Sequence, residues 1–347
     1  MFVFPGQGSQ WPGMALELLD TSPVFAERLR EVATAVEQHV DWTVEDVLRG
    51  TATESIEQIE VVQPVLFTVH LALATLWEHH GIHPDAVIGH SQGEIAAACV
   101  ADALTLHDAA QLIVLRSQLF ADELTGHGGV ASIALSPTEV EKHLTQLNSS
   151  LTIAGINGPH LVTVAGEPDQ LEELVAHTTA QGTRARIIAA TVASHSPQVE
   201  PLRQKLTQLL KFITPRQARI PIYSTVTGHI LNGTELNADY WYENCRRPVL
   251  FEPAIRQLLK NGHHTFIETS AHPVLTLAID QTAEDADTHA LTLGSLRRKE
   301  GGQERFLTSL AHAWTHGTPV NWQQTNTTHN TQTVDLPTYP FQHTHYW

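Results

Sequence analysis

The 347-residue sequence is long enough for one elaborated α/β domain or for a large domain that carries a smaller insertion. Hydrophobic residues make up 42% of it and charged residues 16%, with 18 Pro and 21 Gly along the chain, which excludes a disordered or fibrous protein. A formal net charge of −17 repels polyanions, so we expect no binding to nucleic acid or to anionic membranes, and any anionic ligand must meet a local basic pocket.

Cysteine usage and hydropathy indicate a cytoplasmic, soluble protein. Cys99 and Cys245 have no CxxC spacing, so we expect both to pack as free thiols in a reducing compartment. The most apolar early stretch, residues 65–77, is too short to span a bilayer and is interrupted by His70. The N-terminus also lacks the basic flank and cleavage site of a secretion signal.

The first part of the chain predicts a strand, two helices and then a strand–turn–helix unit. It opens on MFVFPGQGSQ, an apolar strand that enters a Gly-rich turn, as expected for a domain excised from a longer protein. Amphipathic patterns predict helices over residues 23–39 and 64–80. Residues 85–89 then predict a short buried strand that leads into a helix starting near Gln92.

Residues 130–189 predict a small subdomain inserted into the larger one. They follow a Gly-rich linker over residues 126–129 and show the order β-α-β-β-α-β, which a ferredoxin-like fold requires. The expected elements are strands at VASIAL, LTIAGI, HLVTVAGE and ARIIA, and helices from Pro137 to about Leu147 and from Pro168 to about Gln181.

The large subdomain is expected to comprise residues 1–129 and 190–299. After the insertion, helices are predicted to follow Pro197 and Pro248, and strands are predicted at IPIYSTV, HTFIETS and LTLGSL. Because strands and helices alternate, we expect an α/β fold whose mainly parallel sheet has helices on both faces, as in α/β-hydrolases.

The last part of the chain, residues 300–347, is predicted to be a linker. From about Glu300 the helical and strand patterns loosen, and the closing segment is polar, rich in Thr and His, and punctuated by Pro. Its aromatic side chains are too apolar for a free tail, so we expect them to dock on a folded surface. These aromatics are Tyr339, Phe341, Tyr346 and Trp347.

The segment from Gly89 to Gly93 has the G-x-S-x-G form of a nucleophile elbow. At a strand-to-helix corner, a strained serine projects its hydroxyl while flanking glycines let the strand and helix pack closely. The helix that starts near Gln92 aims free N–H groups at the space beside Ser91, where an oxyanion would form. A Gly-rich turn with a capping serine is the alternative, and the strand–turn–helix context favours the nucleophile.

A serine nucleophile needs a base within hydrogen-bond reach, and histidine is the usual one. The 22 histidines leave the choice open on residue patterns alone. His195, in ASHSP, is a good candidate because it follows a predicted strand and precedes a predicted helix.

Five motifs occur along the chain in one order: FPGQGSQWPGM, GHSQGEIAAA, LRSQL, VASHSPQVE and FIETSAHPVL. In this order they resemble malonyl-type acyltransferases of the malonyl-CoA:acyl carrier protein transacylase family. The closing LPTYPFQHTHYW resembles the linker that follows the acyltransferase domain in modular polyketide synthases. The resemblance covers the whole chain and implies an acyl-CoA substrate, an acyl carrier protein with its phosphopantetheine thiol as acceptor, and a neighbouring ketosynthase and other synthase domains as partners.

The resemblance also implies roles for single residues. Ser91 is the serine that becomes acylated, and His195 is its general base. A backbone N–H of Gln7 joins that of Gln92 in the oxyanion hole, and both side chains line the site. The family orients its histidine through a backbone carbonyl near the start of a Pro-initiated helix, and Asn244 matches that position, although any Asp or Glu could serve instead.

Arg116 matches the arginine that grips the free carboxylate of malonyl substrates. That role needs a planar, permanently charged, bidentate donor. A surface helix charge is the alternative, but the surrounding run AAQLIVL is apolar, and an unpaired buried arginine is costly. By the same resemblance Asn157 is expected to line the site, and His272 to be mainly structural.

Extender choice is expected from the four residues that end at the histidine. In the family, HAFH accompanies malonyl and YASH accompanies methylmalonyl; here the residues are VASH. Ser194 leaves room for a substituent at the α-carbon, Val192 removes an aromatic ring, and Gln92 is usual in enzymes for branched extenders. We therefore predict methylmalonyl- or ethylmalonyl-CoA over malonyl-CoA, with ethyl slightly ahead.

Other functions remain open at this point. A serine thioesterase or acyl hydrolase needs the same serine and histidine, a malonyl-specific acyltransferase differs only in its pocket, and a silent docking module would be expected to lose Ser91 or His195. No metal site is expected, because histidine groups such as His79, His80 and His83 lack partner ligands at a recognised metal spacing. Ping-pong acyl transfer, which the resemblance implies, requires no metal or redox cofactor.

Overall fold

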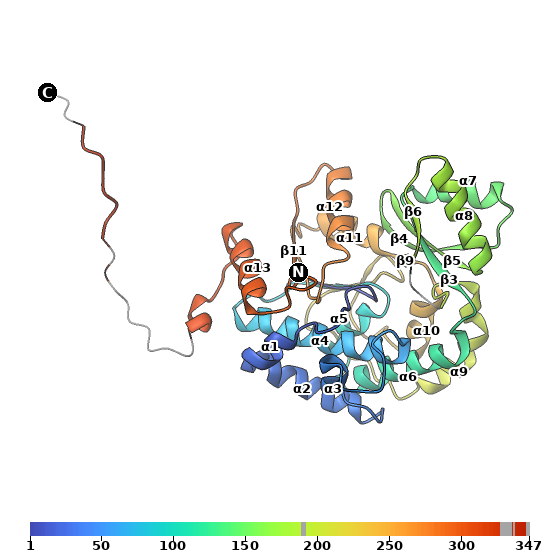
Figure 1. Ribbon diagram of the computed structural model, residues 1–347, viewed down its shortest axis with the longest axis horizontal. Helices are drawn as coiled ribbons and strands as arrows, with labels where there is room; N and C mark the ends of the chain where they lie inside the picture. Colours follow the sequence, from blue (N-terminus) through green and yellow to red (C-terminus); the bar gives the residue numbers. More distant parts are fainter. Residues whose placement is uncertain (189–191, 327–334, 336, 345–347) are drawn as a thin grey trace.

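The computed structural model describes residues 1–188, 192–326, 335 and 337–344. Figure 1 shows a large α/β subdomain, a smaller lobe at one corner and an extended C-terminal segment. The strands of the large subdomain are β1 (Phe2–Phe4), β2 (Val87–Gly89), β7 (Ile222–Tyr223), β8 (Ile230–Leu231), β10 (Thr265–Glu268) and β11 (Leu291–Gly294). They form one sheet in the order β11-β10-β1-β2-β7-β8, parallel throughout except for the β7–β8 pair. The prediction of a mainly parallel sheet is confirmed.

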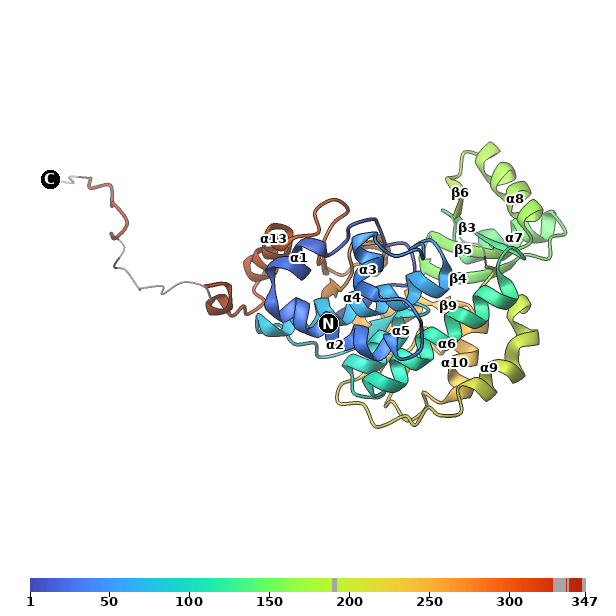
Figure 2. The same ribbon diagram turned by 60° about the horizontal axis from the view of Figure 1, so that its bottom comes forward.

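Helices cover both faces of this sheet (Figures 1 and 2). Alternation along β1 shows why: Phe2 and Phe4 point into the main core, whereas Val3 points into a second core with the helices α11 and α12. The helices of the large subdomain are α1 (Leu16–Thr21), α2 (Pro23–Glu37), α3 (Val44–Arg49), α4 (Ile59–His79), α5 (Gly93–Val100), α6 (Leu106–Leu124), η1 (Pro197–Leu202), α9 (Arg203–Leu209), α10 (Ala238–Arg246), α11 (Phe251–Lys260), α12 (Thr276–Asp285), α13 (Gln303–Thr315) and η2 (Trp322–Asn326).

Helix α4 begins five residues earlier than the sequence pattern suggested. Pro64 lies inside it, and its ring nitrogen has no N–H to donate to the preceding turn. By length and apolarity the helix could cross a membrane, but 89% of its most apolar window is buried within the fold. It therefore serves as a core helix, and its side chains pack against α2 and α6.

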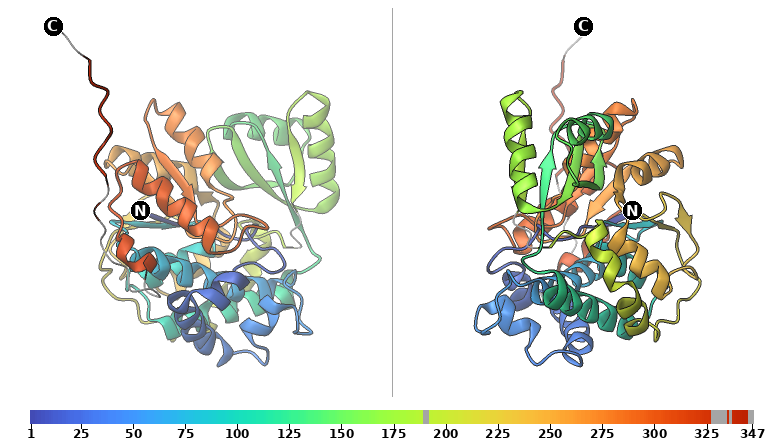
Figure 3. Two further views of the ribbon diagram at one scale, coloured as in Figure 1. Left: turned by 60° about the vertical axis from the view of Figure 1, so that its left-hand side comes forward. Right: turned by 90° about the vertical axis from the view of Figure 1, so that its right-hand side faces the viewer.

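The small lobe has the ferredoxin-like order that the sequence predicts. Its elements are β3 (Gly129–Ile133), α7 (Pro137–Gln146), β4 (Thr152–Gly158), β5 (Leu161–Gly166), α8 (Pro168–Ala180) and β6 (Ala185–Ile188). The four strands are antiparallel in the order β6-β3-β5-β4, with α7 and α8 packed against them (Figure 3).

A fifth strand, β9 (Val249–Leu250), joins the small sheet from the large subdomain. It lies between α10 and α11 in the chain and pairs in parallel with β4. A strand of two residues has no alternation of polar and apolar side chains, so the sequence pattern could not reveal it. The two subdomains therefore share backbone hydrogen bonds as well as side-chain packing.

The segment after residue 299 departs from the predicted linker. Helix α13 buries Phe306, Leu310 and Ala313 in the main core, and the Phe306 ring lies 4.9 Å from that of Trp77. The spacing of these three residues is that of one helical face, which the loosening of the overall pattern obscured.

The predicted docking is also wrong for the two terminal aromatic residues that the structure describes. Tyr339 and Phe341 are 69% and 70% exposed in an extended segment that leaves the body of the molecule (Figure 1). Tyr346 and Trp347 lie outside the described residues. In this chain alone, no surface covers the two described aromatic rings.

Candidate active site

Ser91 occupies a strained corner between β2 and α5. Its φ of 56° is left-handed, a conformation that non-glycine residues rarely adopt. Both flanking glycines are required by close packing: a Cβ on Gly89 would lie 2.1 Å from the Glu94 nitrogen, and one on Gly93 would lie 2.0 Å from the Phe4 carbonyl oxygen. The G-x-S-x-G spacing thus produces the strand–turn–helix corner that it predicts, with the serine at its apex.

Ser91 and His195 are in direct contact. Ser91 Oγ lies 2.8 Å from His195 Nε2, and His195 Nδ1 lies 2.9 Å from the Arg247 carbonyl oxygen. Because a carbonyl oxygen can only accept, Nδ1 carries the proton and Nε2 is left with the lone pair. The geometry therefore presents Nε2 as the acceptor for the Ser91 hydroxyl proton.

The carbonyl that orients His195 belongs to Arg247, three residues after the predicted Asn244. Asn244 lies within α10, whereas Arg247 is its C-cap residue and has an extended backbone. An extended C-cap turns its carbonyl away from the helix, which leaves it free for an outside donor. The Asn244 side chain instead donates a hydrogen bond of 3.1 Å to the Ser91 carbonyl oxygen.

Glu94, in the first turn of α5, stabilises the Ser91 corner through a buried hydrogen-bond network. Its buried carboxylate accepts from the backbone and the hydroxyl of Thr225, from the Tyr240 hydroxyl at 2.6 Å and from Asn244 Nδ2 at 3.1 Å. Burial raises the pKa of Glu94, while these hydrogen bonds act in the opposite direction. The Glu94 network ties the Ser91 corner to α10, the helix whose end orients His195.

His195 is kept neutral by its surroundings. Burial, with smaller contributions from the charges of Arg116 and His90, lowers its pKa to about 3, against the opposing effect of the Arg247 carbonyl. Its φ of 62° is also left-handed, and its backbone N–H donates to the Cys245 carbonyl at 2.9 Å. A neutral imidazole is the form that can accept a proton from a serine.

Arg116, on α6, is a buried cation with only neutral partners. It is 1% exposed; Nη1 donates to Gln63 Oε1 at 2.6 Å and Nε donates to Cys245 Sγ at 3.1 Å. Its guanidinium also lies 5.0 Å from the centre of the Phe120 ring. Among the residues that the structure describes, no carboxylate forms an ion pair with it. Such a buried charge is suited to an anionic ligand.

Gln7 and Gln92, the two residues predicted to form the oxyanion hole, differ in how deeply their side chains are buried. The Gln7 side chain is exposed and accepts from Gln63 Nε2 at 3.2 Å, which links it to the Arg116 cluster. Gln92 is 5% exposed, and neither its amide oxygen nor its amide nitrogen has a hydrogen-bond partner within the described part of the chain. The backbone N–H groups of both residues likewise donate to no described acceptor.

The remaining predicted residues differ in their contacts with the Ser91 corner. Asn157, on β4 of the small subdomain, has its Oδ1 2.8 Å from Nε2 of His90, the neighbour of Ser91. Val192 is buried in the main core, and Ser194 is half-buried directly before His195. His272 Nδ1 accepts from the Arg298 backbone N–H at 3.2 Å, which agrees with a structural role.

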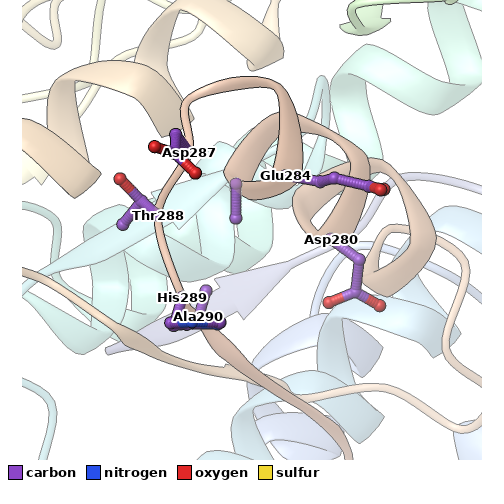
Figure 4. Close-up of a pocket in the computed structure, with 7 residues that line it drawn as sticks. Asp280, Glu284, Asp287, Thr288, His289 and Ala290 are labelled. Carbon is purple, nitrogen blue, oxygen red and sulfur yellow. The ribbon is translucent and has the colours of Figure 1, made fainter.

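A separate surface hollow lies at the end of α12 (Figure 4). It is lined largely by acidic and polar side chains, including Asp280, Glu284 and Asp287, and contains none of the predicted site residues. Negative side chains repel an anionic substrate, so we do not assign the site to this hollow. Within the described residues, no group of three or more His, Cys, Asp or Glu is arranged to hold a metal ion.

Four residues at the site were missed by the sequence interpretation: Gln63, Glu94, Cys245 and Arg247. Glu94 lies within the motif GHSQGEIAAA, and Arg247 lies three residues after Asn244. Both residues therefore had a nearby sequence signal. Gln63 and Cys245 had no local signal, because they meet Arg116 across 53 and 129 residues of sequence.

Comparison with known proteins identifies the family of the chain. The family model described as "Acyl transferase domain" matches residues 1–320. The chain is 50% identical to polyketide synthase GfsE of Streptomyces halstedii over 346 residues and 46% identical to pikromycin polyketide synthase component PikAIII of Streptomyces venezuelae over 347 residues. Each match covers 100% of this chain, which spans only 9% of GfsE and 22% of PikAIII.

A solved structure shows the same fold. The crystal structure of the acyltransferase domain from module 8 of the salinomycin polyketide synthase matches with a TM-score of 0.91 and 51% sequence identity. The match covers 93% of this chain and 76% of that one. The two-subdomain α/β fold predicted from the sequence is thereby confirmed.

Proposed function

The chain belongs to the acyl transferase domain family, and from this premise we propose that it transfers an α-branched malonyl-type extender unit from coenzyme A to the phosphopantetheine thiol of an acyl carrier protein. The contact that best supports this proposal is the 2.8 Å pair of Ser91 Oγ and His195 Nε2. It is accompanied by a buried arginine, Arg116, which has no anionic partner among the described residues. Together they supply a nucleophile, its base and a binding group for a second carboxylate.

In the first half-reaction, Ser91 Oγ attacks the thioester carbonyl carbon while its proton moves to His195 Nε2. The N–H groups of Gln7 and Gln92 receive the oxyanion that forms. The carbon–sulfur bond then breaks, and the proton passes from Nε2 to the departing sulfur. Coenzyme A leaves as a thiol, and an ester on Ser91 remains.

The second half-reaction reverses this sequence with a different thiol. The phosphopantetheine thiol gives its proton to His195 Nε2 as its sulfur attacks the ester carbon. The bond to Ser91 breaks, and the proton returns to Oγ. Every proton is handled by one imidazole, so the proposed chemistry needs neither a metal nor a redox cofactor.

Hydrolysis is the competing reaction, because water could replace the carrier thiol. A thioesterase for simple acyl chains has no use for a buried cation beside its nucleophile, and such a cation is costly without an anionic ligand. Arg116 therefore favours a dicarboxylic acyl group and a transferase. The contact between Ser91 and His195 likewise favours an active enzyme over a silent docking module.

The extender is the finer part of the proposal. Ser194 is smaller than the phenylalanine of the malonyl pattern, and Val192 is smaller than the tyrosine of the methylmalonyl pattern. We place ethylmalonyl-CoA first, methylmalonyl-CoA next and malonyl-CoA last. Competition among the three by kcat/KM tests this order, and malonyl-CoA as the best substrate would support the malonyl-specific alternative.

The relatives support a proposal for the partners and the location of this chain. GfsE and PikAIII are polyketide synthases many times longer than this chain, so we propose an acyl carrier protein, a ketosynthase and other synthase domains as its partners in the cytoplasm. The free thiols of Cys99 and Cys245 are compatible with that reducing compartment.

Intact mass measurement after incubation with malonyl-, methylmalonyl- and ethylmalonyl-CoA tests the function directly. One acyl mass should appear on the parent protein and be absent from Ser91→Ala, since that change removes only the attacking oxygen. Ser117→Ala is the matched control, because within the described part of the chain the Ser117 hydroxyl bonds only to its own helix at Val114. His195→Ala should slow both half-reactions by about 10² or more. An acyl mass that persisted in Ser91→Ala would refute the proposal.

A further inference from the structure

Cys245 lies where the two halves of the site meet. It is fully buried in the last turn of α10, and its carbonyl oxygen accepts from the His195 backbone N–H at 2.9 Å. Its sulfur accepts from Arg116 Nε at 3.1 Å. One residue thus touches the proposed base through its backbone and the proposed carboxylate-binding group through its side chain.

The hydrogen bonds of Arg116 show what this sulfur controls. A guanidinium has five N–H donors: one on Nε and two on each terminal nitrogen. Cys245 occupies Nε and Gln63 occupies one N–H of Nη1, while Phe120 lies against the guanidinium. The second N–H of Nη1 and both on Nη2 have no described partner.

The occupied donors determine how a carboxylate can approach. A bidentate carboxylate uses either the edge formed by Nε and one terminal nitrogen or the edge formed by Nη1 and Nη2. With the sulfur on Nε, the first edge is occupied, whereas in the second edge both N–H groups of Nη2 and one of Nη1 have no described partner. Two neutral acceptors therefore orient the cation without neutralising it, which leaves its charge for the ligand.

We infer that Cys245 is a positioning residue for extender selection: its sulfur directs the Nη1–Nη2 edge of Arg116 toward the second carboxylate of the acyl group. This inference rests on the proposed function. The side chain acts only through Arg116, whereas the bond to His195 comes from the backbone and survives substitution. Loss of the sulfur should therefore impair selection of dicarboxylic acyl groups and leave the acyl-transfer chemistry in place.

Three substitutions and one control separate positioning from packing. Cys245→Ala removes the acceptor, Cys245→Val removes it at nearly constant volume, and Cys245→Ser restores an acceptor. Cys99→Ala is the control, since it removes the other buried thiol, which lies near Arg28 and Asp102 rather than Arg116. For each protein, kcat and KM are measured for methylmalonyl-CoA and propionyl-CoA, with the pH profile of kcat.

The ratio of kcat/KM for methylmalonyl-CoA over propionyl-CoA should fall about 10-fold in the Ala and Val variants, through KM for methylmalonyl-CoA, because one hydrogen bond to a charged group is lost. The Ser variant should recover most of the ratio, Cys99→Ala should keep it, and the pH profile should not move. An unchanged ratio in both Ala and Val, or an equal loss for both substrates in all three Cys245 variants, would overturn the inference. A parent protein that is not acylated at Ser91 would instead overturn the proposed function.

Discussion

Glu94 and Arg116 are buried charged groups near the same dyad, and their surroundings differ in kind. Glu94 accepts four hydrogen bonds from Thr225, Tyr240 and Asn244, so its charge is fully satisfied by the protein. Among the residues that the structure describes, Arg116 has only neutral acceptors, and three of its five N–H groups have no partner. This difference shows that burial of a charge does not by itself indicate a functional residue. A buried charge whose hydrogen-bond partners are incomplete does indicate one.

Of the two buried charges, Arg116 should produce the larger change in activity when it is removed. Arg116→Ala should lower kcat/KM for methylmalonyl-CoA by about 10²–10³-fold, the usual effect of truncating one member of a buried charge pair, while propionyl-CoA is affected little. Stability to urea should hardly change, because an uncompensated buried cation is removed.

Arg203→Ala is the matched control, since Arg203 also lies 5.0 Å from an aromatic ring, that of Tyr242, but is exposed. It should leave the ratio of the two substrates unaltered. If Arg116→Ala still discriminated against propionyl-CoA as strongly as the parent, the carboxylate role of Arg116 would be wrong.

Glu94 should show the opposite pattern. Glu94→Gln places an amide N–H₂ among donors and should cost about 3 kcal/mol of unfolding free energy, as for other buried networks left with unpaired donors. It should lower kcat for every acyl group alike, because the Ser91 corner loses its tie to α10.

Urea denaturation measures this cost, with Glu139→Gln as control. Glu139 accepts from Ser136 in an exposed capping box, so its replacement should matter far less. A stability loss no greater than that of the control would show that the Glu94 network does not anchor the corner.

The pH dependence of kcat/KM tests the electrostatic side of the comparison. The neutral imidazole is the active base, and a pKa of about 3 for His195 keeps it neutral well below its ordinary value. The profile should therefore stay level on acidification, whereas a histidine with the ordinary value would lose about 30-fold at about pH 5. In Arg116→Ala an acid limb should shift upward, because that cation helps to lower the pKa. An acid limb near the ordinary histidine value in the parent would contradict this account.

Extender choice should show the smallest effect. Val192→Tyr adds an aromatic ring beside Ser194 and His195 and should move preference from ethylmalonyl- toward methylmalonyl-CoA by about 10-fold, the worth of one methylene in an apolar pocket. Ser194→Phe should move it further, toward malonyl-CoA. Competition assays measure both shifts, and no shift with Val192→Tyr would remove Val192 from the explanation.

Local patterns predicted those parts of the molecule that depend on neighbouring residues. The corner at Ser91 follows from five consecutive residues, and the ferredoxin-like order follows from strands and helices long enough to show a period. Strand β7 lies within the predicted strand IPIYSTV, whereas the two-residue strands β8 and β9 are too short for any period. Helix α13 did carry its spacing in Phe306, Leu310 and Ala313, and was missed because the flanking segments are polar.

The site needed information that no local pattern contains. Ser91 and His195 meet across 104 residues, and their pairing was predicted by family resemblance rather than by spacing. The orienting carbonyl was placed at Asn244 instead of Arg247, because it depends on where α10 ends and how its last residue turns. Backbone groups carry no side-chain signature, so the sequence cannot mark which of several adjacent carbonyls is free.

The burial of α13 bears on how this domain can be exchanged between proteins. A junction cut directly after residue 299 would leave the apolar surface beneath Phe306 and Leu310 open to water, at about 1.5–3 kcal/mol for each large side chain withdrawn. A foreign sequence grafted at that point would have to supply a matching helical face against Trp77. A junction placed after η2, beyond Asn326, keeps this helix with its own core and transfers the domain as one folding unit.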